Sequence, residues 1–283
     1  MAPVPGAPSE NTAARQPSRA APRAPDLNGA AHVWWWRPPQ LVVPEDLELL
    51  GTDEFQRALG LLAERDAAAF VHTRAGARRA LAGLLPVAPR TIELGRRPCP
   101  GCGDFGHGPP VISHPPVPWA ISLSRTAGCG VFALGDGHAI GVDVEAVRPM
   151  RQASLYDSVL TRNERAHLAA LPPGPARDTV FHRVWTRKEA VVKAAGLGLV
   201  GTALDRLETW PARTGPVRVL HTHSGRTTVW SVQDLHLDDR VAAAIARPPG
   251  DTPPGPVHIH PVTEPAPVPG HTAAPRTEGN RPS

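Results

Sequence analysis

Proline is concentrated at the two ends of the chain. Residues 1–30 contain 6 of the 35 prolines and residues 248–283 contain 11, and both ends carry few large apolar side chains. Proline has a fixed φ and no backbone N–H, so it is excluded from helix interiors and central strands. A segment that also lacks apolar surface does not offset the entropy lost on ordering. We therefore expect disordered tails at 1–30 and 248–283, with a folded region between them.

The central region, residues 31–247, has an α+β pattern in which each half contains strand-like apolar runs and two helical stretches. In the first half, 31–137, we expect strands at 32–37, 119–124 and 131–134, and helices at 52–70 and 74–85. In the second half, 138–247, we expect strands at 139–145, 217–220, 227–232 and 241–246, and helices at 161–170 and 176–195. The Gly and Asp residues of 135–138 predict a hairpin turn. The halves resemble each other in pattern, although no residue-level repeat is visible.

The composition disfavours several classes of protein. No run of 18 apolar residues is present, so we expect no membrane span, and the absence of a signal-like N-terminus favours a cytoplasmic location. Three cysteines are too few for a disulfide framework. The net charge of +4 is mild and dispersed, which argues against nucleic acid or a membrane surface as the partner.

Two carboxylates on one face of a strand are the first candidates for chemistry. In the run 142–145, side chains alternate, so Asp143 and Glu145 share a face opposite Val142 and Val144. The apolar neighbours indicate a buried strand, in which acidic groups need a cationic partner, and carboxylate oxygens suit a hard divalent cation. The alternative is a solvated strand face with two acids of no further consequence.

The long helix supplies a third acid beside a lysine. Trp185, Glu189 and Lys193 are spaced i, i+4 and i+8, so they line one stripe of the helix. Lys188 and Lys193 are the only two lysines among 30 basic residues. Lysine is a compact charge that can hold or lose a proton, whereas arginine cannot. The alternative is an ordinary Glu–Lys helix pair beside a packing tryptophan.

Taken together, the strand and the helix carry a recognisable pair of motifs. Gly141-Val142-Asp143-Val144-Glu145 is followed by Trp185-Thr186-Arg187-Lys188-Glu189-Ala190-Val191-Val192-Lys193. In order, spacing and context, the pair resembles the signature of the Sfp-type 4′-phosphopantetheinyl transferases. The resemblance covers about 31–247 and is strongest over 118–200.

The resemblance implies two similar α+β halves related by a pseudo-two-fold axis, with coenzyme A bound between them in a monomer. It implies Mg²⁺ held by Asp143, Glu145 and Glu189, and transfer of the phosphopantetheine arm to a serine of an acyl or peptidyl carrier protein, with release of 3′,5′-ADP. Glu189 would help remove the serine proton, and Lys188 and Lys193 would hold phosphate oxygens. Carrier proteins of fatty-acid, polyketide or peptide assembly all fit.

The first half departs from the family pattern at two positions. Leu123 stands where the family has a histidine that meets the 3′-phosphate of coenzyme A, and Pro109 stands where it has a lysine or arginine. Each lost charge-assisted contact costs about 1.5–3 kcal/mol. The expected coenzyme A contacts are Ser122, Ser124, Arg57 and Arg78, with Arg74 and Arg79 as further candidates. The alternative function is that of a degenerate, non-catalytic homologue that binds a carrier protein or a nucleotide.

Two further motifs have local interpretations. Thr161 and Glu164 form a capping box at a helix start, so Glu164 is left out of the catalytic set. Cys99, Cys102 and His107 have the residue types of three zinc ligands, with His114 or Cys129 as the fourth. A Gly/Pro-rich loop with two reduced thiols is the favoured interpretation of that segment.

Overall fold

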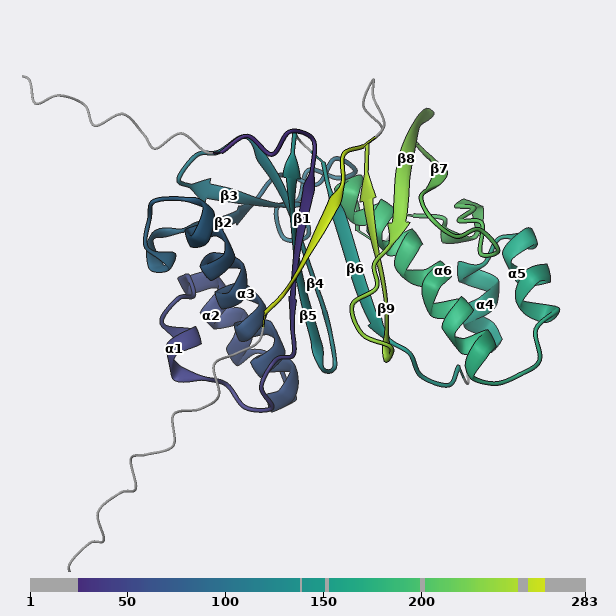
Figure 1. Ribbon diagram of the computed structural model, residues 1–283, viewed down its shortest axis with the longest axis horizontal. Helices are drawn as coiled ribbons and strands as arrows, with labels where there is room; N and C mark the ends of the chain where they lie inside the picture. The colour runs from purple at the N-terminus through teal and green to yellow at the C-terminus, as the bar shows by residue number, and fades with distance from the viewer. Residues whose placement is uncertain (1–24, 138, 151–152, 199–201, 249–253, 263–283) are drawn as a thin grey trace, which may run out of the picture.

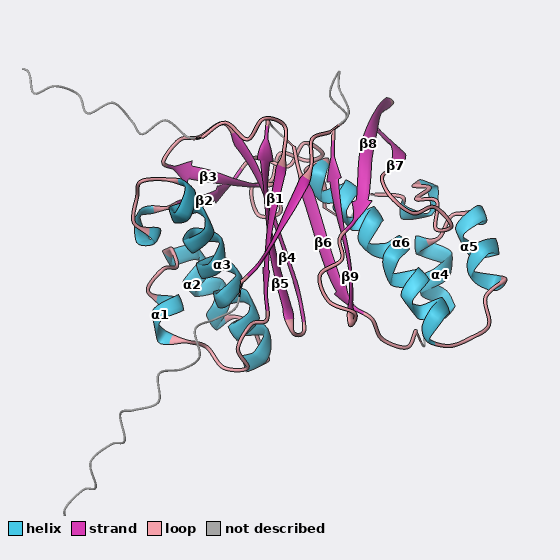
Figure 2. Cartoon of the chain, in the orientation of Figure 1, coloured by secondary structure: helices cyan, strands magenta, loops and turns pink. Residues whose placement is uncertain are grey.

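The computed structural model describes residues 25–262 except for 138, 151–152, 199–201 and 249–253 (Figure 1). Two four-stranded sheets lie side by side in the middle of the molecule, and helices cover the outer side of each (Figure 2). The α+β class predicted from the sequence is confirmed, whereas the pseudo-two-fold relation between the halves stays a prediction. No helix in the described ranges is long and apolar enough to cross a membrane.

The first sheet has the order β10-β1-β5-β4 and is built mainly from the first half of the chain. The apolar side of α3 packs on β4 and β5, where it contacts Ile121, Phe132 and Leu134. The elements are β1 (Ala31–Trp36), α1 (Pro44–Leu47), α2 (Thr52–Leu59), α3 (Glu64–Leu84), β2 (Glu93–Arg96), β3 (Pro110–His114), β4 (Trp119–Thr126) and β5 (Cys129–Asp136). The expected helix at 52–70 is wrong at its end, because α2 ends at Leu59 before Gly60 and a new helix begins at Glu64.

The second sheet has the order β6-β9-β8-β7. Its inner elements are covered by α6, whose Ala190, Val191 and Ala194 pack on Val219 and Ala244. The elements are β6 (Gly141–Ala146), α4 (Ala153–Val159), α5 (Arg162–Ala169), α6 (Pro175–Ala194), β7 (Val217–His223), β8 (Arg226–Asp234) and β9 (Val241–Arg247). The sequence anticipated α6 and the β7–β8 hairpin to within a few residues, because both carry strong local signals.

The two sheets meet through β4 and β6, which are joined by side chains instead of a backbone ladder. The hydroxyl oxygens of Ser122, Ser124 and Thr126 accept hydrogen bonds from the backbone N–H groups of residues 142, 144 and 146, at 3.0, 3.4 and 3.2 Å. Alternating hydroxyl side chains on one strand therefore satisfy the free edge of the other, which would otherwise leave buried donors unpaired. Behind this seam, Val33 and Ala133 of one sheet pack with Val142 and Ile245 of the other.

The structure corrects the expected hairpin at 135–138. β5 pairs with β1 and β4, whereas β6 pairs with β9 in the other sheet, so this turn carries the chain between sheets. The Gly and Asp residues do mark a turn, since Gly137 has a φ of 83°. A turn signal fixes a local reversal of the chain but does not determine which strand becomes the neighbour.

The predicted disordered tail at 248–283 is wrong for part of its length. Residues Val257–Pro261 form β10, a parallel edge strand on β1 in which His258 pairs with His32. His32 Nδ1 lies 3.0 Å from His260 Nε2. An edge position tolerates Pro261 because one side of the strand needs no backbone donor. At the other end, Leu27 and Ala30 are buried within the predicted tail at 1–30, while 1–24 and 263–283 lie outside the described residues.

Candidate functional site

A pocket of about 370 Å³ lies where β4, β6, α3 and α6 approach one another. Its lining combines acids and one lysine from the second half with arginines from the first half. These are Asp143, Glu145, Glu189 and Lys193 on one side, and Arg57, Arg74, Arg96 and Arg125 on the other. The site is therefore built by both halves of the chain, which explains why neither half shows it alone in the sequence.

β6 delivers two acids to the pocket, as the alternation of its side chains predicts. The strand lies so close to α6 that a Cβ on Gly141 would be 1.9 Å from the carbonyl oxygen of Ala190. Only glycine permits this approach, which brings the strand acids within reach of side chains from the helix. Asp143 is buried, and its Oδ1 accepts from Ser124 Oγ at 2.8 Å and from Lys193 Nζ at 2.6 Å.

Asp143 also carries an unused acceptor. Its Oδ2 is buried and, within the described part of the chain, has no hydrogen-bond partner. A buried carboxylate oxygen without a donor is costly, so a cation or a protonated group is expected to face it. Asp143 is thus a strong candidate for a metal ligand.

The helix side of the pocket supplies Glu189 and Lys193, one turn apart on α6. Burial, followed by the negative charge of Asp143, raises the pKa of Glu189 to about 7, with a further contribution from Glu145. Burial and the charge of Asp143 also raise the pKa of Glu145. Two acids whose pKa values are raised in this way are typical of a cation-binding or acid–base site.

The three carboxylates share the pocket but do not converge tightly. Over the described residues, the group of three His, Cys, Asp or Glu ligand atoms that lie within 4.8 Å of one another is Cys99, Cys102 and His107, and the acids form no such group. Lys193 Nζ, 2.6 Å from Asp143, supplies the positive charge that moderates their repulsion. Asp143, Glu145 and Glu189 are the pocket residues with oxygen ligands for a divalent cation.

Four arginines form the opposite wall, which the sequence anticipated only in part. The guanidinium carbons of Arg57, Arg74 and Arg125 lie 5.5, 5.5 and 5.1 Å from the centre of the Phe70 ring. Burial lowers the pKa of Arg74 to about 10, the charge of Glu54 opposes this shift, and the neighbouring arginines add to it. Glu54 Oε1 lies 3.6 Å from Arg74 Nε and neutralises part of this charge. Cations held this close together make a receptor for an anion.

Arg96 and Arg125 are pocket residues that the sequence analysis missed. Arg125 follows Leu123 by two positions on β4, so both side chains are on the same face of the strand, and both line the pocket. Strand alternation could therefore have identified Arg125 as a cation beside the position of the absent histidine. Arg96 has no comparable signal, because the sequence predicted no strand in its part of the chain.

Arg78 and Arg79 do not reach the pocket, contrary to expectation. Arg78 is buried, with its NH2 nitrogen 2.7 Å from Glu54 Oε2, and it donates from Nε to the carbonyl oxygen of Ile92 at 3.0 Å. Arg79 pairs with Asp46 at 2.5 Å. On a helix such as α3, positions 74 and 78 share a stripe, but the depth of each side chain depends on its packing partners. Of the first-half arginines considered, Arg57 and Arg74 are the ones in the pocket.

Ser122 and Ser124 lie at the pocket, and both hydroxyls already have structural partners. Ser122 accepts from the backbone of Val142, and Ser124 bridges Asp143 and Lys193. Leu123 and Pro109 line the same pocket. The two positions where the family pattern is broken therefore face the site, and an apolar side chain occupies each.

The expectation that Lys188 holds phosphate oxygens is contradicted by its surroundings. The side chain is fully buried, and its Nζ donates to the carbonyl oxygens of Val159 and Leu204, both at 2.7 Å. It also lies 2.6 Å from Glu164 Oε2, a second fully buried charge. Positions 188 and 193 are five residues apart, which places them about 140° from each other around a helix. The two lysines therefore face different surroundings.

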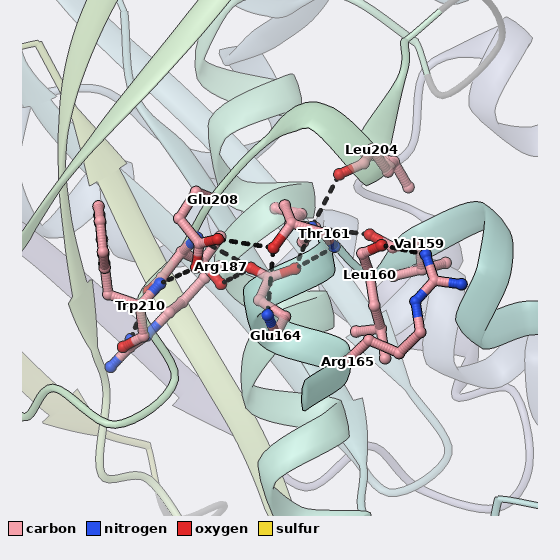
Figure 3. Close-up of polar contacts among 11 residues, drawn as sticks. Val159, Leu160, Thr161, Glu164, Arg165, Arg187, Leu204, Glu208 and Trp210 are labelled. Carbon is pink, nitrogen blue, oxygen red and sulfur yellow. Dashed lines mark hydrogen bonds and ion pairs between the residues drawn. The ribbon is translucent and has the colours of Figure 1, made fainter. Parts of the chain in front are cut away.

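Glu164 lies at the centre of a second polar cluster, in which it contacts Lys188, Thr161 and Thr209 (Figure 3). The predicted capping box is confirmed: Thr161 N–H donates to Glu164 Oε2 at 2.8 Å, and the backbone N–H of Glu164 donates to Thr161 Oγ1 at 3.2 Å. Glu164 Oε1 also accepts from the N–H and hydroxyl of Thr209, at 2.8 and 2.6 Å. With Lys188, these contacts tie α5 and α6 to the segment before β7.

Comparison with known proteins gives a consistent result. Residues 139–246 match the family described as the 4′-phosphopantetheinyl transferase superfamily. This region includes the three acids and the lysine that β6 and α6 contribute to the pocket. The chain is 34% identical over 177 residues to an L-aminoadipate-semialdehyde dehydrogenase-phosphopantetheinyl transferase of Eremothecium gossypii, which covers 59% of this chain and 63% of that protein. It is 29% identical over 238 residues to the 4′-phosphopantetheinyl transferase HetI of a Nostoc species, which covers 76% of this chain and 93% of that protein.

Among solved structures, a holo-acyl-carrier-protein synthase from Thermotoga maritima aligns with a TM-score of 0.27 and 20% identity over 38% of this chain and 61% of that chain. The matched region spans less than two thirds of the Eremothecium protein. The sequence matches confirm the resemblance that the two motifs predicted.

Proposed function

From the resemblance of residues 139–246 to the 4′-phosphopantetheinyl transferase superfamily, we propose that this chain transfers the phosphopantetheine arm of coenzyme A to a carrier protein. A serine hydroxyl of an acyl or peptidyl carrier protein attacks the phosphorus nearest the pantetheine. The bond from that phosphorus to 3′,5′-ADP breaks, and the serine proton passes to a base. The observation that carries the proposal is the pocket that joins three acids and a lysine to four arginines.

The charge distribution of the pocket suits coenzyme A. The arginine wall offers several planar donors for the phosphates of the adenylate end, and the guanidinium group forms paired hydrogen bonds with phosphate oxygens. Arg125 is well placed to compensate for Leu123, because it belongs to the same face of β4. The acidic side then lies nearer the pyrophosphate, where bond breaking occurs.

Mg²⁺ fits the acidic side, because Asp143 Oδ2 is a buried acceptor without a donor in the described part of the chain and two further carboxylates share the pocket. Asp143, Glu145 and Glu189 would hold it, with water and phosphate oxygens as the remaining ligands. When bound, Mg²⁺ supplies positive charge that offsets the charge on the transferred phosphoryl group.

The chain's own residues position the reactants and move the proton. Glu189 is the base that accepts the serine proton, directly or through water. Lys193 is held by Asp143 at 2.6 Å and Ser124 at 2.9 Å, and would offset charge that develops on the phosphate oxygens. Trp185, on the same helix, packs against the core cluster that contains Leu160 and Leu168, and so helps to hold the helix that carries both groups.

The test is a mass measurement on an apo carrier protein incubated with the full chain, coenzyme A and Mg²⁺. We expect a mass gain of one phosphopantetheine arm, which is lost with Asp143→Asn and with Glu189→Gln. Glu93→Gln, an exposed acid on β2, is the matched control and should retain the gain. Absence of transfer to fatty-acid, polyketide and peptide carriers alike would overturn the proposal. We also propose a monomer in the cytoplasm, and size-exclusion chromatography tests the first of these points.

A non-catalytic binding module is the second candidate, favoured by the apolar Leu123 and Pro109 in the pocket wall. It predicts that the chain binds coenzyme A or a carrier protein in calorimetry without any mass gain. The enzyme predicts both binding and transfer, so the two measurements together separate the candidates.

A further inference from the structure

The loop between β2 and β3 contains a tight turn built on two cysteines, outside the acidic site. The backbone N–H of Gly103 donates to the carbonyl oxygen of Cys99 at 2.8 Å, and the N–H of Cys99 donates to the carbonyl oxygen of Asp104 at 2.9 Å. Gly103 has a φ of 78°, which favours glycine at this position. The turn thus folds the sequence from Cys99 to Cys102 back on itself and directs both thiols to the same side.

His107 completes a cluster of three soft ligands. The Sγ atoms of Cys99 and Cys102 and a ring nitrogen of His107 all lie within 4.8 Å of one another. Cys102 Sγ is 3.2 Å from His107 Nε2. Around a tetrahedral zinc ion with bonds of about 2.0–2.3 Å, such ligand atoms are separated by about 3.5–3.8 Å. The cluster therefore needs little movement to hold a zinc ion.

A carboxylate orients the histidine from behind. His107 Nδ1, the nitrogen on the far side of the ring from Cys102, lies 3.2 Å from Asp104 Oδ2. In metal sites, a ligating histidine almost always donates its other N–H to a carboxylate, a carbonyl or water, which fixes the tautomer and the ring orientation. The pairing with Asp104 leaves Nε2 as the free acceptor toward the two thiols.

We propose that Cys99, Cys102 and His107 bind a zinc ion, with solvent as the fourth ligand. Solvent has access because Cys102 and His107 are exposed, whereas Cys99 is buried. Neither His114 nor Cys129 joins the group of ligand atoms in the described structure, so the fourth ligands considered from the sequence are wrong. The preference for a loop of two unliganded thiols is revised by the geometry of three converging groups.

The metal would brace one wall of the pocket. His107, Gly108, Pro109 and Pro110 line that pocket directly. The loop also packs on the end of α6, since a Cβ on Gly196 would lie 3.1 Å from Pro109 and 3.3 Å from Pro100. A zinc ion that closes the loop therefore holds this wall against the helix that carries Glu189 and Lys193. The proposal does not depend on the transferase activity, because metal content is measured directly.

The test is the zinc content of the full chain purified in reducing buffer without chelator and then dialysed against Zn²⁺. We expect one equivalent of zinc per chain, and Co²⁺ substitution should give thiolate-to-metal charge-transfer bands and visible bands of a tetrahedral centre. Cys102→Ser and His107→Ala should lose the metal. Asp104→Asn should weaken zinc affinity by about 10–100-fold, as expected for a group that orients a ligand. His114→Ala, an exposed histidine on β3, is the matched control and should retain full zinc.

Circular dichroism of each variant establishes that the chain is folded, so that metal loss reports on the site. A chain that contains no zinc and takes none up overturns the proposal. Uptake that is unaffected by Cys102→Ser and His107→Ala also overturns it, because the metal would then be bound elsewhere. A third outcome is a chain that holds a Cys99–Cys102 disulfide and no metal even after purification in reducing buffer. This outcome would assign the turn to redox chemistry and would overturn the zinc proposal.

Discussion

Replacing Lys188 by methionine separates a structural lysine from a phosphate-binding one. In the structure, Lys188 is fully buried, and its Nζ contacts Glu164 at 2.6 Å and two backbone carbonyl oxygens at 2.7 Å. Methionine fills a similar volume but leaves the Glu164 carboxylate buried without its counter-ion. We therefore expect Lys188→Met to reduce stability, with no specific effect on coenzyme A binding.

The magnitude follows from the burial of the pair. Breaking a fully buried ion pair by removing one partner costs about 3–5 kcal/mol. Glu164 keeps hydrogen bonds from Thr161 and Thr209 in the variant, which favours the lower end of that range. A loss of about 3 kcal/mol reduces the folding equilibrium constant by about two orders of magnitude. For a domain of this size, it lowers the melting temperature by roughly 6–12 °C.

The assay is urea unfolding followed by tryptophan fluorescence, together with the KM for coenzyme A at a temperature where the variant is folded. The double variant Lys188→Met/Glu164→Gln removes both charges and should recover part of the lost stability, with a coupling of about 1–3 kcal/mol. Lys193→Met is the matched control, because Lys193 is partly exposed at the pocket and should affect catalysis more than stability. An unchanged unfolding free energy with a raised KM in Lys188→Met would refute the structural role.

Three further predictions concern packing, the arginine wall and the C-terminal strand. Gly141→Ala should lower the free energy of unfolding in urea by about 3 kcal/mol or more, because the new Cβ would lie 1.9 Å from the backbone of α6. Gly83→Ala has no atom within 4 Å of the new Cβ and should be neutral or slightly stabilising, so equal losses in both would contradict the argument. Arg125→Met should raise the KM for coenzyme A by about 10–100-fold with kcat little changed, and an unchanged KM would remove Arg125 from the phosphate site. Burial, followed by the charge of His260, lowers the pKa of His32, with His258 acting in the same direction and Asp136 opposing it. Burial also lowers the pKa of His260. Because the folded state favours the neutral rings, the stability they give is present above pH 6.5 and is lost as the pH falls below it. Hydrogen exchange should show that β10 amides lose protection when the pH falls below 6.5, while the amides of β9, which contains no histidine, do not. Equal protection of β10 above and below pH 6.5 would contradict this.

Local patterns predicted much of the second half, because its signals act over short distances. The i, i+4 spacing of Glu189 and Lys193 and the alternation of Asp143 and Glu145 each fix a shared face within one element, and all four residues line the pocket. The capping box at Thr161 is equally local, and the structure contains it. These three patterns each lie within one helix or strand, and the structure agrees with all of them.

Contacts between distant segments were beyond this kind of reasoning. Composition suggested that 257–261 was part of a disordered tail, but a free edge on β1 gives that segment a partner. The loop containing Cys99 is rich in glycine and proline, and only its folded turn shows that His107 approaches both thiols. The depth of each arginine on α3 also depends on acids such as Glu54, which comes from another helix.

The sequence by itself determined the chemistry of this protein: which residues are acidic, which helix and strand carry them, and which family they resemble. Tertiary structure alone decided which of those residues share one pocket. Lys188 and Lys193 belong to the same motif, yet one is buried against Glu164 and the other reaches Asp143. The reason is that a helix directs side chains five positions apart to different sides, and the packing of other elements around the helix determines which side becomes the site.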